Sequence, residues 1–277
     1  MTLLEVTDLS VSFGRRRRVA VEGVSFTLDA GQRLGIIGES GSGKTVTALA
    51  VLGLLPDNAQ VAGSVRLAGR ELIGLDDAAH ARLRGDLVSM VFQEPMTALD
   101  PTMRVGRQVA EVLRLHASER AGATRARVIE MLGRVGLADA ERVADSFPHQ
   151  LSGGQRQRCL MAMALINSPD LVICDEPTTA LDVTVQARVL ALLDEVLTAE
   201  GAACLFISHD LAVVSHVCSD VLVMLDGRIV EAGPVAKLFT APEHPYTRGL
   251  VVTARIDQLP PGQRLPTVED FYPRVTR

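Results

Sequence analysis

The stretch Gly38-Glu39-Ser40-Gly41-Ser42-Gly43-Lys44-Thr45 decides the fold of this chain. It fits the pattern G-x-x-x-x-G-K-[ST], follows the apolar run Arg33–Ile37, and precedes a segment that predicts a helix from about Lys44. Glycines in such a loop let successive backbone N–H groups converge on phosphate oxygens, and the helix N-terminus adds positive field. We therefore predict a nucleotide-binding loop in which Lys44 contacts the β- and γ-phosphates and Thr45 ligates Mg²⁺. A surface loop rich in glycine and serine is the weaker alternative, since it does not account for the strand and helix on either side.

Two adjacent acids end a second apolar run, Leu171–Cys174. Neighbouring residues at the end of a strand point in different directions, so Asp175 and Glu176 suit two roles. Beside a phosphate loop, we expect Asp175 to hold Mg²⁺ and Glu176 to polarise the attacking water. The alternative is a strand followed by a helix whose first turn favours acidic residues.

Apolar runs alternate with helical patterns along most of the chain, which predicts an α/β fold with a mostly parallel sheet covered on both faces. Residues 1–31 predict an antiparallel β region, Val65–Leu67 a short edge strand, and residues of about 95–160 a helical region. A late hairpin is expected around the turn Asp226-Gly227. We assign residues 1–233 to one nucleotide-binding domain and residues 234–277 to a short, less regular C-terminal extension.

Composition narrows the class of protein. The chain has 277 residues, 47% of them hydrophobic, and a formal net charge of −5, which argues against a nucleic-acid partner. Its four cysteines are scattered, as expected of small apolar residues in a reduced cytosolic protein. No apolar run approaches the roughly 20 residues that span a bilayer. We therefore expect a soluble cytosolic chain that would serve a membrane only as a peripheral subunit.

A third motif, Leu151-Ser152-Gly153-Gly154-Gln155, resembles the signature of ATP-binding cassette (ABC) ATPases. The resemblance covers residues 1 to about 250. It implies a RecA-like P-loop core with an antiparallel β subdomain and an α-helical subdomain, and a head-to-tail dimer in which this motif closes over the partner's ATP. A plain helix cap with Ser152 at the N-cap fits the same residues and does not exclude that role.

The resemblance also implies roles for single residues in the expected order. Gln93 is similar to the glutamine that touches Mg²⁺ or water and senses the membrane subunit, and Asp182 to an aspartate that bridges the dimer interface. His209 resembles the histidine that contacts the γ-phosphate, and Phe13 the aromatic residue that stacks on adenine. A strand phenylalanine is more often part of the core. The implied catalytic residues are Glu176, His209 and Lys44.

Two segments resemble the ATPases of peptide and nickel importers: residues 91–101, which read VFQEPMTALDP, and His244–Leu250, which read HPYTRGL. This implies a peripheral subunit at the cytoplasmic face of the membrane that hydrolyses ATP to power uptake of peptides, nickel or metal chelates. Its implied partners are a second, non-identical ATPase, two membrane permeases and an extracytoplasmic substrate-binding protein. Many relatives carry a cysteine cluster near their C-terminus. No cysteine follows Cys218, so no iron–sulfur cluster is expected.

Alternatives of another class remain. A soluble ABC ATPase could act on DNA or the ribosome. However, DNA-repair types carry a long coiled-coil insertion before the signature, and translation types carry two cassettes. The sequence shows neither feature. A regulatory cassette without hydrolysis conflicts with intact Glu176 and His209. Arg15–Arg18 are expected at a solvated hairpin tip, and His216 with Cys218 is a weak candidate for a metal site.

Overall fold

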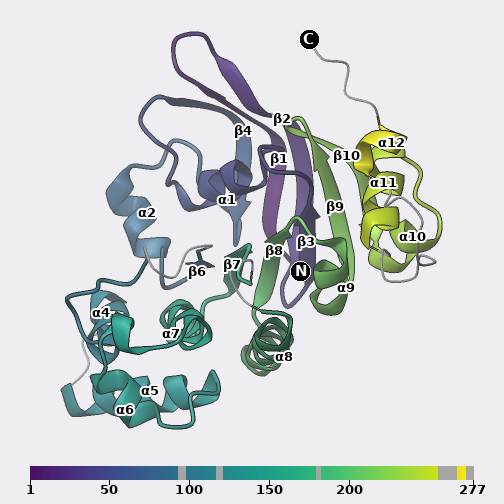
Figure 1. Cartoon of the computed structure of the whole chain (residues 1–277). Helices are drawn as coiled ribbons and strands as arrows, with labels where there is room; N and C mark the ends of the chain where they lie inside the picture. Colours follow the sequence, from purple (N-terminus) through teal and green to yellow (C-terminus); the bar gives the residue numbers. More distant parts are fainter. Residues whose placement is uncertain (93–97, 117–120, 179–181, 255–266, 273–277) are drawn as a thin grey trace.

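The computed structural model describes residues 1–92, 98–116, 121–178, 182–254 and 267–272. Two sheets and a set of helices make up these residues (Figure 1). In chain order the strands are β1 (Thr2–Phe13), β2 (Arg18–Asp29), β3 (Arg33–Ile37), β4 (Ala59–Leu67), β5 (Arg70–Glu71), β6 (Val88–Val91), β7 (Leu171–Asp175), β8 (Ala203–Ser208), β9 (Asp220–Leu225) and β10 (Arg228–Pro234). The helices are α1 (Lys44–Leu52), α2 (Asp77–Leu83), α4 (Val105–His116), α5 (Ala121–Arg134), α6 (Ala140–Asp145), the 3-10 turn η1 (Pro148–Gln150), α7 (Gly153–Leu165), α8 (Val183–Glu200), α9 (Leu211–Val217), α10 (Val235–Thr240), α11 (Pro245–Ala254) and α12 (Val268–Phe271).

The second sheet positions the phosphate loop. Its order is β10-β9-β3-β8-β7-β6, and every pairing is parallel except that of β9 with β10. The strand β3 therefore lies inside the sheet, and its residues Leu34, Ile36 and Ile37 are all buried. A strand covered on both faces reads as a continuous apolar run, which confirms the predicted mostly parallel sheet and the α/β fold class.

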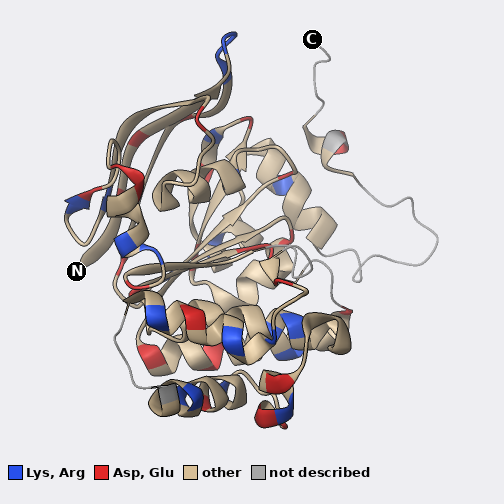
Figure 2. Cartoon of the chain, turned by 90° about the vertical axis from the view of Figure 1, so that its left-hand side faces the viewer, with Lys and Arg blue, Asp and Glu red and all other residues tan. Residues whose placement is uncertain are grey.

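The first sheet is antiparallel, with the order β2-β1-β4-β5. The tip of its β1–β2 hairpin is basic (Figure 2), as expected for Arg15–Arg18, and Arg17 there has a φ of 49°. The expected edge strand Val65–Leu67 was too short: β4 runs from Ala59 and lies between β1 and β5. Pairing with β1 holds its first half, where Gln60, Gly63 and Ser64 interrupt the apolar residues and Gly63 faces a register shift in β1. A strand segment that is held by backbone pairing, and not by a run of apolar side chains, cannot be recognised from the apolar pattern of the sequence.

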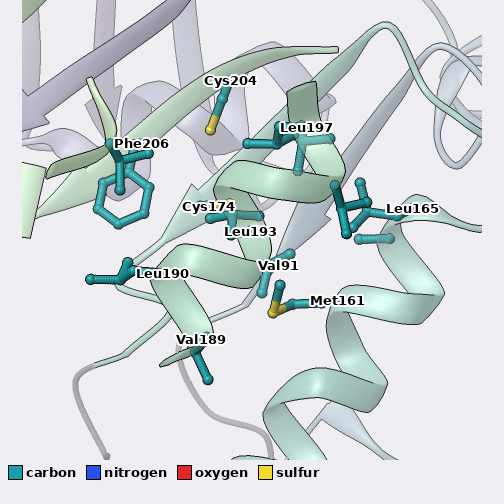
Figure 3. Close-up of a cluster of buried hydrophobic side chains, with 14 of the residues drawn as sticks. Val91, Met161, Leu165, Cys174, Val189, Leu190, Leu193, Leu197, Cys204 and Phe206 are labelled. Carbon is teal, nitrogen blue, oxygen red and sulfur yellow. The ribbon is translucent and has the colours of Figure 1, made fainter. Parts of the chain in front are cut away.

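Two buried clusters flank the second sheet. One lies between the two sheets and includes residues of α1 together with Ile36, Leu205 and Ile207. The other covers the opposite face, where α7 and α8 pack against strands β7 and β8 through Cys174, Cys204 and Phe206 (Figure 3). The four cysteines are buried and free, and burial raises the pKa of Cys159 to about 12. They serve as small apolar residues, as predicted.

Beyond Pro234 the chain is more regular than the sequence predicts. Instead of irregular chain, α10, α11 and α12 follow β10. Two prolines of this region stand where a helix accepts them, because Pro234 is the N-cap of α10 and Pro245 is the first residue of α11. Among the described residues, no helix combines the length and the hydropathy needed to cross a bilayer.

Candidate nucleotide-binding site

The loop between β3 and α1 takes a conformation that needs its glycines. Gly38, Gly41 and Gly43 have φ values of 154°, 81° and 104°. A Cβ atom at Gly38 would lie 2.2 Å from the carbonyl oxygen of Met224, and one at Gly43 would lie 2.7 Å from that of Ala20. The helix α1 begins at Lys44, as predicted. The backbone is thus curled as tightly as a phosphate cradle requires.

Lys44 is held at this loop by its own backbone. Its Nζ atom donates hydrogen bonds to the carbonyl oxygens of Gly38 at 2.8 Å and Glu39 at 2.9 Å. Burial lowers the pKa of Lys44, while the nearby carboxylates of Glu176, Asp175 and Glu39 act in the opposite direction. The side chain is 5% exposed, so its charge acts in a poorly solvated place.

Asp175, the last residue of β7, meets the phosphate loop through Thr45. The Thr45 hydroxyl hydrogen-bonds to the Asp175 carboxylate, whose pKa burial raises. The other carboxylate atom, Oδ1, is buried and has no hydrogen-bond partner among the described residues. A hydroxyl beside a carboxylate with a spare oxygen matches the hard oxygen ligands that Mg²⁺ prefers. These two residues fit the cation that the sequence assigns to them.

Glu176 and His209 come together at the same edge of the sheet. The parallel strands β7 and β8 are neighbours, so the residues that follow their carboxyl ends meet. Glu176 has a φ of 47°, and its N–H donates to the carbonyl oxygen of Ile207 at 2.9 Å. Its Oε2 atom lies 3.2 Å from Nδ1 of His209. A left-handed conformation at a residue other than glycine is typical of functional positions, and it was not visible in the sequence.

A cavity of about 670 Å³ unites these groups. Eight of the predicted residues line it: Glu39, Ser40, Gly41, Gly43, Lys44, Thr45, Glu176 and His209. The sequence did not predict five others: Ala20 and Val46 beside the loop, and Leu250, Thr253 and Val268 from α11 and α12. The motif His244–Leu250 was the only sequence signal near Leu250, Thr253 and Val268. It did not indicate that this part of the chain lies beside the phosphate loop.

The signature residues lie away from this cavity. Ser152 is the N-cap of α7; its Oγ accepts from the N–H of Gln155 at 3.3 Å, and Gln155 Oε1 accepts from the N–H of Ser152 at 2.9 Å. Leu151 is buried, Gly153 is exposed, and a Cβ at Gly154 would lie 2.7 Å from Val185. None of these five lines the cavity. The helix cap is present, and the role toward a partner's ATP stays a prediction.

Four further predicted residues have different outcomes. Asp182 is the exposed N-cap of α8 and accepts from the N–H of Val185 at 2.9 Å. Phe13 does not line the cavity; it is partly buried against the core between the sheets, so stacking on adenine stays a prediction. Ser42 is buried behind the loop with no hydrogen-bond partner for its Oγ in the described part of the chain. Gln93 lies outside the described residues.

Comparison with known proteins agrees with this arrangement. Residues 21–179 match the ABC transporter family. The oligopeptide transport ATP-binding protein OppD of Mycobacterium bovis is 50% identical over 253 residues, which cover 90% of this chain but only 41% of that protein. OppD of Salmonella typhimurium is 44% identical over 278 residues, with 99% of this chain and 82% of that protein covered.

Solved structures give the same result. The dimeric bacterial ABC transporter cassette MJ0796 has a TM-score of 0.74 and 26% identity, with 84% of this chain and 99% of that chain covered. The same cassette is known as a dimer in a post-hydrolysis state bound to ADP and phosphate, at the same TM-score of 0.74. The chain belongs to the ABC transporter family.

Proposed function

We propose that this chain is the ATP-binding and ATP-hydrolysing subunit of an ABC importer that takes up peptides. The observation that carries the proposal is a single cavity lined by the phosphate-loop lysine Lys44, the acid Glu176 and His209. The names of the relatives from M. bovis and S. typhimurium, which both refer to oligopeptide transport, favour peptides over nickel or metal chelates as cargo.

The chemistry follows from the positions of these side chains. The loop's backbone and Lys44 bind the phosphates of ATP, and Glu176 accepts the proton of the water that attacks the γ-phosphate. His209, held by Glu176, donates to the oxygens on which charge develops. Mg²⁺, held by Thr45 and Asp175, would supply further charge neutralisation when bound.

We further propose that the site is completed by a second, non-identical ATPase. The signature residues Leu151–Gln155 do not line this chain's own cavity, so their exposed helix N-terminus is available to another subunit's nucleotide. Asp182 and the neighbouring Val183, which is 83% exposed, would lie at the same contact. The dimeric state of the MJ0796 cassette supports the pairing of two cassettes.

A second groove, with a lining separate from that of the nucleotide cavity, suits a membrane partner. A cavity of about 500 Å³ lies where α4 and α7 meet β6, and it is lined mostly by apolar side chains. Phe92 and Leu54 line it and remain 42% and 37% exposed. We propose that this groove receives a cytosolic segment of one of two permeases. That contact would hold the chain at the cytoplasmic face of the membrane. An extracytoplasmic binding protein would deliver the cargo to the permeases.

Purification from the native membrane tests this proposal. Tagged chain extracted in mild detergent should bring down two permeases and a second ATPase, and Lys44→Ala should keep those partners while losing ATP hydrolysis. Membrane-free protein whose ATP hydrolysis rises with DNA or ribosomes, and which recovers no permease, would instead establish the soluble alternative.

A further inference from the structure

The start of α11 is fixed to the second sheet by a short network. The Glu231 carboxylate, on β10, accepts hydrogen bonds from the backbone N–H groups of Glu243 and His244, both at 2.9 Å. The N–H of Tyr246 in turn donates to Nδ1 of His244 at 3.2 Å. Pro245 begins the helix, where its missing N–H costs nothing. The position of Tyr246 is therefore set by β10 and not by a free tail.

Tyr246 reaches the phosphate loop. Its side chain is 1% exposed, and its ring meets that of Tyr272 edge-on, with centroids 6.2 Å apart. The Tyr246 hydroxyl accepts a hydrogen bond of 2.8 Å from the backbone N–H of Glu39. The carbonyl of the same Glu39 accepts from Lys44 Nζ at 2.9 Å and from the N–H of Ser42 at 3.2 Å. One residue of the loop is thus held from both sides, by Tyr246 and by Lys44.

The two C-terminal helices also form a wall of the cavity. Leu250 and Thr253 of α11, with Val268 of α12, line it opposite the loop. The helices pack closely, since a Cβ at Gly249 would lie 3.1 Å from the Cα of Val268. Tyr246 lies on α11, so its hydrogen bond with Glu39 connects this wall of the cavity to the phosphate loop.

We propose that Tyr246 is a positioning residue for the phosphate loop, and that α11 and α12 form a built-in wall of the nucleotide site. This inference rests on the proposed ATP binding. A loop already held in its binding conformation loses less entropy when phosphates bind, so the hydroxyl increases affinity without touching the ligand. Coupling of this kind is reciprocal: nucleotide must stabilise the contact between Tyr246 and Glu39 by as much as that contact stabilises bound nucleotide.

Removing the hydroxyl alone tests the first half of the proposal. In the full chain, Tyr246→Phe should raise KM for ATP roughly threefold to tenfold, the worth of one hydrogen bond, with kcat about unchanged. Tyr272→Phe is the matched control, because its ring makes the same aromatic contact, and it should leave KM unchanged. A merely structural role would lower the amount of active protein, and so kcat, without moving KM. An unchanged KM in Tyr246→Phe overturns the proposal.

Amide hydrogen exchange on the unmodified chain tests the second half. ATP with Mg²⁺ should slow exchange in residues 38–45 and also in residues 245–254, while α5, which packs on α4, α6 and α7, serves as the control segment. Protection of residues 38–45 without residues 245–254 would refute the coupling and leave ATP binding intact. Absence of protection in both segments would instead count against the proposed function itself.

Discussion

Nδ1 of His209 lies 3.2 Å from Oε2 of Glu176, although the two residues follow different strands. The imidazole is about half exposed, whereas the carboxylate is 15% exposed, so the pair spans the boundary between the cavity and solvent. In the proposed mechanism, Glu176 would take a proton from a water on the cavity side, and His209 would donate to the phosphates. The proposal assigns hydrolysis, and not only nucleotide binding, to this pair of residues.

Replacing the acid of this pair isolates its chemical role. Glu176→Gln keeps the size of the side chain and one acceptor oxygen but removes its basicity. Hydrolysis should fall by about 10²-fold to 10⁴-fold, with ATP affinity retained. Single-turnover hydrolysis and equilibrium nucleotide binding measure the two quantities. Undiminished turnover would exclude Glu176 as the base.

Replacing the histidine tests stabilisation of charge on the phosphate. His209→Ala should lower kcat by roughly 10²-fold, as expected when one donor to the developing charge is lost. His216→Ala provides a matched control, because His216 is an exposed histidine on α9 that hydrogen-bonds to Ala212 and does not line the cavity. Equal effects of both substitutions on kcat would contradict the assignment.

The buried Asp175 carboxylate is expected to lower the free energy of unfolding of the metal-free chain, although it provides a ligand for Mg²⁺. Burial raises its pKa, so between the unfolded and folded pKa values the folded state holds a proton that the unfolded chain has released. Above both values, ionisation therefore lowers the free energy of unfolding. Asp175→Asn should raise Tm at pH 7 in EDTA. The same substitution should abolish the hydrolysis that Mg²⁺ supports.

The pH dependence of the increase in Tm of Asp175→Asn tests whether the charge of Asp175 causes that increase. As the pH falls through the raised pKa of Asp175, the wild-type carboxyl becomes protonated in the folded state, and the difference in Tm should shrink. It should disappear below the ordinary aspartate pKa. A difference that stays constant with pH would mean that repacking, and not charge, explains the gain.

Gly43 should tolerate no side chain. Gly43→Ala would press a Cβ to 2.7 Å from the carbonyl oxygen of Ala20 at a φ of 104°, so we expect a loss of about 1–3 kcal/mol in the free energy of unfolding and loss of ATP binding. Gly133→Ala is the control: it lies within α5 with nothing within 4 Å of the added atom, and it should stabilise by about 1 kcal/mol. Urea denaturation measures both, and a harmless Gly43→Ala would disprove the tight cradle.

Local pattern explains what could be predicted from the sequence. The bounds of β3, the start of α1 at Lys44 and the turn at Asp226-Gly227 all follow from apolar runs, glycines and turn residues a few positions apart. The length of β4 was missed because backbone pairing with β1, and not a continuous apolar run, holds its first half. The contact of Tyr246 with Glu39 was missed because 207 positions separate the residues, and no local pattern records such a pairing.

The place of β3 in the sheet has a consequence for biosynthesis. Its two neighbours, β8 and β9, begin only at Ala203 and Asp220, so this early apolar strand leaves the ribosome long before either of them. At about 5–20 residues per second, the delay is roughly 10–30 s. Until then an aggregation-prone segment is unpaired, and cellular chaperones are expected to bind the nascent chain during this interval.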